Sequence, residues 1–160
     1  MRLPPTLAGA LALLSVLAAC GGDGGDRACG PITRESLDPG YLVHVLGGAD
    51  VDYTSDPPTS GPHQPTPPIE GVVDEALPRP VQVGILERGD VLLQHDPDLP
   101  ADQRGALDAL AGAGVVIAPN PDLDEPVVAT AWLYKRTCGT VDPDALGAFV
   151  AARRGHGPDS

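Results

Sequence analysis

Proline is concentrated in one part of this chain, since eight of its 19 prolines fall between residues 54 and 80. A proline fixes its own φ angle and lacks the amide hydrogen that a helix interior or a central strand requires. Most of this stretch is therefore expected to be an ordered loop or polyproline-like backbone. A loop of this length is unusual in a small domain and often has a functional role.

The rest of the chain alternates short apolar runs with turn signals, which predicts a small α+β domain. Strands are predicted over residues 42–46, 81–85, 91–95, 115–118 and 127–134. The turn signal at residues 87–90 predicts a β-hairpin between the second and third of them. Helices are predicted over residues 101–113 and after Asp142-Pro143, a typical N-cap followed by proline. The expected fold is a small, mostly antiparallel sheet with two helices on one face and the long Pro-rich ordered loop. Trp132 and Tyr134 alternate along the last strand, so both are expected on one face, in the core.

The first 19 residues have the features of a secretory signal peptide. Arg2 supplies positive charge, and the apolar run over residues 7–17 falls short of the about 20 residues that span a membrane. The sequence Leu17-Ala18-Ala19-Cys20 resembles the lipobox of bacterial lipoproteins. That resemblance implies cleavage before Cys20 and acylation of its thiol. The expected location is the cell membrane, lipid-anchored, with the protein facing the extracytoplasmic side.

Glycine and aspartate dominate residues 20–30, which are therefore expected to form a flexible tether. Residues 31–160 are then left for a single globular domain. The alternative for the leader is a plain secreted protein or an uncleaved anchor, in which Cys20 is incidental.

The charge balance excludes two classes of partner. The chain has 10 Lys and Arg against 22 Asp and Glu, a net charge of −12. A strongly acidic domain cannot bind nucleic acid by neutralising phosphates, and it cannot bind a membrane surface through a polybasic patch. The expected contact with the membrane is the lipid anchor alone.

Three cysteines are present, and lipidation of Cys20 would leave Cys29 and Cys138. Two thiols outside the cytoplasm are the number that one disulfide needs. A redox or metal-ligating pair is the alternative, although the chain has no CxxC motif.

The sequence Asp56-Pro57-Pro58-Thr59-Ser60-Gly61-Pro62-His63 resembles the "PPTSGPH" signature of DUF3105, a bacterial family of unknown function. The resemblance extends over residues 86–91, 129–132 and 157–159, and it covers about residues 41–159. It implies an envelope-associated or secreted single domain without an established activity. In the family's second stretch, "VHxLEHGxV", two positions usually held by histidine are Gly84 and Arg88 here, whereas Glu87 is retained.

His63, Glu87 and His95 are the candidate ligands for a metal ion. Imidazole and carboxylate groups suit copper or zinc, and His95 could partly replace the two absent histidines. Against a metal site, no two of these residues show the tight spacing of known motifs. The alternative is that His63 hydrogen-bonds to backbone and fixes the Pro-rich segment.

A hydrolytic site is the third hypothesis, with Ser60 as nucleophile and His63 as base. The chain lacks the GxSxG elbow, so the Ser and Thr hydroxyls are instead expected to satisfy local backbone. The function expected from the sequence is a non-enzymatic binding or structural module with an unidentified ligand or envelope protein partner. Its candidate binding surface combines the Pro-rich loop with the predicted hairpin. The residues of that surface are Pro57, Pro58, Thr59, Ser60, His63 and Glu87.

Overall fold

The computed structural model describes residues 1, 28–65 and 67–158. The predicted leader, Cys20 and all but the end of the predicted tether lie outside the described residues. No helix within the described ranges is long and apolar enough to cross a membrane.

A six-stranded sheet forms the centre of the domain, with the strand order β1-β6-β5-β3-β4-β2. Its strands are β1 (Thr33–Arg34), β2 (Gly71–Val72), β3 (Val91–His95), β4 (Val115–Pro119), β5 (Val127–Ala131) and β6 (Tyr134–Cys138). The pairs β1–β6, β6–β5 and β5–β3 are antiparallel, whereas β3–β4 and β4–β2 are parallel. The α+β class is correct, but the expectation of a mostly antiparallel sheet is wrong because the sheet is mixed. A helix crosses over between β3 and β4, and such a crossover makes two strands parallel.

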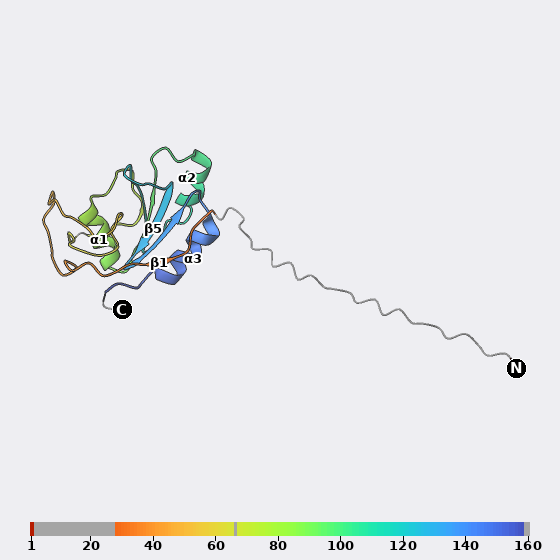
Figure 1. Cartoon of the computed structure of the whole chain (residues 1–160). Helices are drawn as coiled ribbons and strands as arrows, with labels where there is room; N and C mark the ends of the chain where they lie inside the picture. Colours follow the sequence, from red (N-terminus) through yellow and green to blue (C-terminus); the bar gives the residue numbers. More distant parts are fainter. Residues whose placement is uncertain (2–27, 66, 159–160) are drawn as a thin grey trace.

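Helices cover both faces of this sheet (Figure 1). They are α1 (Arg79–Glu87), α2 (Ala101–Asp108) and α3 (Pro143–Arg153). Leu93 of β3 packs in one core cluster with Leu107 of α2 and Phe149 of α3. Its neighbour Leu92 points the other way, into a second cluster with Ile85 of α1. This alternation of side chains along a buried strand places α1 opposite the other two helices.

The α1 helix corrects the largest error of the sequence prediction. Residues 81–85 were expected to form the first strand of a hairpin, because Val81, Val83 and Ile85 alternate with other residues. They are helical, and all seven residues from Pro80 to Leu86 are buried. A helix buried on every side has no polar face to show a period of 3.6 residues, and its β-branched residues then imitate a strand. The turn at residues 87–90 therefore joins α1 to β3.

The expected long strand over residues 127–134 is also wrong, because it is divided into β5 and β6. Trp132 and Leu133 form the connecting turn, in which Leu133 has a φ of 62°. As a result, Trp132 packs in the α1 cluster whereas Tyr134 packs against the cluster of α2 and α3. The expectation that both aromatic rings share one face is therefore wrong.

Other elements follow the predicted pattern more closely. The α3 helix begins after Asp142, whose carboxylate accepts a hydrogen bond from the Ala145 amide (2.9 Å). The helix predicted over residues 101–113 is present but ends at Asp108. The strand predicted over residues 42–46 is absent, since only His44 forms an isolated bridge and Leu42 and Leu46 are exposed.

The predicted disulfide between Cys29 and Cys138 is confirmed. It joins the chain just before β1 to the last residue of β6. Backbone hydrogen bonds accompany it, from the Gly30 amide to the Thr137 carbonyl and from the Gly139 amide to the Ala28 carbonyl, both 2.9 Å. The bridge thereby fixes the start of the folded region against an inner strand of the sheet.

Candidate metal centre

The segment from Asp56 to His63 lies against the end of the sheet, with Pro57, Pro58, Thr59 and Ser60 all buried. The Thr59 hydroxyl donates to the Glu35 carboxylate (2.8 Å), and the Ser60 hydroxyl accepts from the Asp38 amide (2.9 Å). The Leu133 amide donates to the Thr59 carbonyl (3.1 Å). These contacts attach the segment to the residues that follow β1 and to the turn between β5 and β6.

Lys135 and Glu35 form an ion pair beneath this segment, with Nζ and Oε1 2.9 Å apart. The same ammonium group donates to the Asp56 carbonyl (3.1 Å). Burial acts to raise the pKa of Glu35, but hydrogen bonds from Ser55, Lys135 and Thr59 outweigh it and hold that pKa below its usual value. The carboxylate is therefore ionised at neutral pH, when it can accept from both Lys135 and Thr59.

Just before His63, the backbone turns at Gly61 in a conformation that only glycine accommodates. Its φ is 130°, and a Cβ atom there would lie 2.9 Å from the ring of Tyr53. The Tyr53 hydroxyl donates to the Pro62 carbonyl (2.7 Å), and burial together with the charge of Asp38 raises the pKa of Tyr53 to about 12. The tyrosine therefore stays protonated and holds the backbone on which His63 is carried.

His63 is 1% exposed, and its backbone pairs with the loop around His44. The His63 amide donates to the Val43 carbonyl and the Val45 amide donates to the His63 carbonyl, both at 2.9 Å. This parallel bridge places the two imidazoles side by side, with ring centroids 4.7 Å apart and ring planes at 74°. His44 itself is exposed.

The two ring nitrogens of His63 have different partners. Nδ1 lies 3.1 Å from the Gly61 carbonyl oxygen. Nε2 lies 2.9 Å from Oε2 of Glu87, the last residue of α1. Although this distance is short, the buried Nε2 has no hydrogen-bond partner of good geometry, so the carboxylate lies off the axis of an Nε2–H bond.

His44, His63 and Glu87 together form one cluster, in which the ligand atoms all lie within 4.8 Å of one another. Burial changes across it from the enclosed His63 through the half-buried Glu87 to the exposed His44. Two imidazoles and one carboxylate are the donor set of one known type of zinc site, which leaves a fourth position open.

A family model described as "Protein of unknown function (DUF3105)" matches residues 44–160. The chain belongs to the DUF3105 family. No curated protein and no solved structure matches it. The match begins at His44, so all three residues of the cluster lie within the part that this DUF3105 model covers.

Gly84 and Arg88 occupy the positions at which the DUF3105 resemblance implies histidines. Arg88 follows α1 directly, and its guanidinium donates to the Gly84 carbonyl (3.2 Å) and pairs with Asp90 (3.0 Å). Neither residue can supply a metal ligand, since glycine has no side chain and arginine has no free electron pair at neutral pH.

His95 does not belong to the cluster, although the sequence suggested it as a ligand. His95 is the last residue of β3, whereas Glu87 precedes the first residue of that strand. The five strand residues between these two ends span about 13 Å, so the two side chains lie far apart. Its Nδ1 lies 2.7 Å from the Asp96 carbonyl oxygen. The expectation that His95 and Glu87 bind one ion assumed a β-hairpin over residues 81–95, and that hairpin is not formed.

Sequence reasoning did not propose His44 as a ligand. The only signal was a histidine within a short apolar run, and that run was interpreted as a strand. A backbone bridge between residues 44 and 63 leaves no pattern in the sequence, because it depends on how two loops pack.

The Ser60–His63 pair of the hydrolytic hypothesis is not formed within the described residues. The Ser60 hydroxyl accepts from the Asp38 amide, and the two nitrogens of His63 face Gly61 and Glu87. A general base must lie within hydrogen-bonding reach of the hydroxyl that it activates. This arrangement therefore gives no support to nucleophilic catalysis by Ser60.

Proposed function

We propose that this domain binds one zinc or copper ion through His44, His63 and Glu87, and that it does so on the outer side of a cell membrane. The observation that supports metal binding most directly is the state of the His63 ring. One nitrogen is committed to a backbone carbonyl, and the other is buried against a carboxylate without an aligned hydrogen bond.

The contact with Gly61 sets the tautomer of this ring. A carbonyl oxygen only accepts, so Nδ1 bears the proton, and in a neutral imidazole Nε2 then has a free electron pair. An ionised Glu87 is likewise only an acceptor. Two such atoms 2.9 Å apart repel each other unless a cation lies beside both. Metal-ligating histidines typically donate their second nitrogen to a carbonyl or carboxylate in this way.

Protonation of His63 is the competing explanation, and it corresponds to the structural role expected from the sequence. An imidazolium would donate from both nitrogens and pair with Glu87. It gives no reason for the adjacent imidazole of His44, which a metal ion would use as a third ligand. The clustering of three donors therefore favours a metal ion.

The donor set and its surroundings narrow the class of ion. Imidazole with carboxylate suits Zn(II) and Cu(II), whereas Ca(II) and Mg(II) prefer oxygen ligands alone. The exposed His44 gives the ion a route from solvent, and the Pro-rich segment would act as the ordered frame that fixes His63. A site of this kind is suited to binding or transferring an ion at the envelope.

Metal titration of the purified full-length protein tests this function. Calorimetry with Zn(II) and with Cu(II) is expected to show one ion per chain. His44→Ala and Glu87→Gln should each weaken binding by more than about 100-fold. Loss of a residue that only hydrogen-bonds to a ligand lowers metal affinity by about 10–100-fold, and loss of a ligand itself should cost more. His95→Ala and the exposed His156→Ala serve as matched controls and should bind as the unchanged protein does. The proposal would be contradicted if the protein bound neither metal. It would also be contradicted if His44→Ala and Glu87→Gln bound the metal as tightly as the unchanged protein does.

The membrane location is proposed from the Leu17-Ala18-Ala19-Cys20 motif and the Gly/Asp-rich residues that follow it. Cys20→Ala should move the protein out of the membrane fraction and abolish incorporation of labelled palmitate, because two or more acyl chains provide the anchoring. Fractionation of cells that express the two forms makes the measurement. A variant that stays in the membrane fraction would exclude the lipid anchor.

A further inference from the structure

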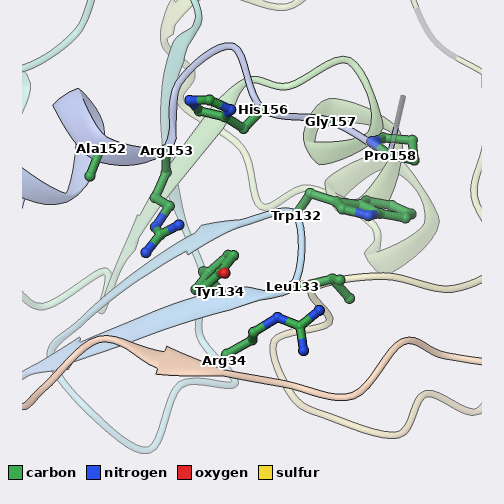
Figure 2. A pocket seen from close by; sticks show the side chains of 9 residues that line it. All are labelled: Arg34, Trp132, Leu133, Tyr134, Ala152, Arg153, His156, Gly157 and Pro158. Atoms are coloured by element: carbon green, nitrogen blue, oxygen red, sulfur yellow. The ribbon is translucent and has the colours of Figure 1, made fainter. Parts of the chain in front are cut away.

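A pocket lies at the turn between β5 and β6, away from the metal cluster. It has a volume of about 340 Å³, is open to solvent, and is lined by that turn, by Arg34 of β1 and by the end of α3 with the segment that follows it. Figure 2 shows the side chains that line it, with Arg153 and His156 on one side and Arg34 on the other. Its size is at the lower end of the range of small-molecule sites.

Two guanidinium groups face this pocket, and Tyr134 lies between them. Arg34 is directly opposite Tyr134 in the β1–β6 register, and the Arg153 guanidinium carbon lies 3.5 Å from the centroid of the same ring. The Nε atom of Arg153 is buried without a hydrogen-bond partner. Two like charges therefore lie in one pocket. The face of the Tyr134 ring stabilises the Arg153 cation, and an anion placed between the two guanidinium groups would offset their mutual repulsion.

No carboxylate among the described residues balances these charges. The residues that line the pocket include no Asp or Glu. The ion pairs of the described ranges use Arg79, Arg88, Arg104 and Lys135, so Arg34 and Arg153 form none. In a chain with a net charge of −12, two arginines that gather without an acidic partner indicate a site for an external anion.

The remaining wall of the pocket is apolar and rigid. Trp132 and Leu133 contribute it from the two-residue turn, where Leu133 is the only described non-glycine residue with a positive φ. A left-handed conformation is strained for a non-glycine residue, and such strain often occurs where a side chain must be presented to a ligand.

We propose that this pocket binds a small organic anion, whose phosphate or carboxylate group pairs with Arg34 and Arg153 and whose apolar part lies against Trp132 and Leu133. A planar guanidinium matches the two oxygens of either group. The imidazole of His156 adds a further donor at the rim. This site is independent of the metal cluster and requires none of its residues.

Fluorescence of Trp132, the single tryptophan of the chain, provides a direct measurement. Phenyl phosphate, benzoate and inorganic phosphate are titrated into the full-length protein at constant ionic strength. Phenyl phosphate or benzoate should change the emission saturably, and the better of the two identifies the preferred anionic group. Arg34→Gln and Arg153→Gln should each weaken that binding at least tenfold, whereas Arg104→Gln, which changes a half-buried residue of α2, should not.

Three results would overturn the proposal. The first is that neither organic probe changes the emission saturably. The second is that Arg34→Gln and Arg153→Gln bind the probe as tightly as the unchanged protein does. The third is that the organic probes bind no more tightly than inorganic phosphate. Because Arg34 is exposed, its substitution leaves the fold intact even if loss of the Arg153–Tyr134 contact destabilises the other variant.

Discussion

Replacement of both Cys29 and Cys138 by alanine is expected to lower the free energy of unfolding by about 4–5 kcal/mol. The disulfide spans 109 residues, and the entropy that such a bridge removes from the unfolded chain increases with the length of the loop. Urea unfolding of the double variant, beside the unchanged protein with and without reductant, measures the difference. Labelling of free thiols before and after reduction confirms which samples contain the bridge.

The folded state gives a second reason for a large effect. The first strand, β1, is only two residues long, and within the described residues it pairs with β6 alone. Without the bridge, a few backbone hydrogen bonds and the side-chain hydrogen bonds of Arg136 and Thr33 would retain residues 28–34 on the sheet. An unchanged unfolding midpoint in the double variant would show that the loop entropy is compensated in the reduced chain and would contradict the prediction.

Lys135→Met is expected to destabilise the domain by about 2–3 kcal/mol at pH 7. The substitution removes the ammonium partner of the half-buried Glu35 carboxylate, and removal of one partner from a buried pair costs more than the pair itself contributes. It also removes the donor to the Asp56 carbonyl, at the start of the segment that positions His63.

The pH dependence distinguishes this explanation from a simple loss of packing. The pKa of Glu35 is lowered in the fold, so its contribution to stability is present above its usual pKa and is lost as the pH falls through the folded-state value. The cost of Lys135→Met should therefore shrink in acid, where Glu35 is protonated. Unfolding curves at pH 7 and in acid, below the folded-state pKa of Glu35, test this.

A double variant, Glu35→Gln with Lys135→Met, serves as the control. Its stability at pH 7 should exceed that expected from adding the two single effects, because it leaves no unpaired charge. Strict additivity, or a cost of Lys135→Met that is the same at both pH values, would show that the charge pair is not the cause.

The elements that sequence reasoning found are those with local chemical signals. Asp142-Pro143 marked the start of α3 through its capping chemistry, and the apolar runs at residues 91–95 and 115–118 marked two central strands. The disulfide followed from the number of thiols, and the family from the motif that ends at His63.

The errors arose where tertiary packing overrides local preference. Residues 81–85 have a strand-like alternation but form a helix, because burial on all sides removes the polar positions that would show its period. That single error also produced the wrong hairpin and the wrong third ligand. Glu87 and His63 were found because both lie in the family motifs, whereas His44 depends on a contact between two loops that no local pattern encodes.

The covalent ring closed by Cys29 and Cys138 determines what a protease can release from this protein. A single cut between these residues, for example in the exposed loop around Leu46, leaves two fragments joined through sulfur. Such a nicked molecule would migrate as two pieces only after reduction, and both pieces would remain attached to whatever holds the N-terminus. A cut after Cys138 has a different result: the last helix, α3, lies outside the ring and would then be retained by its packing alone.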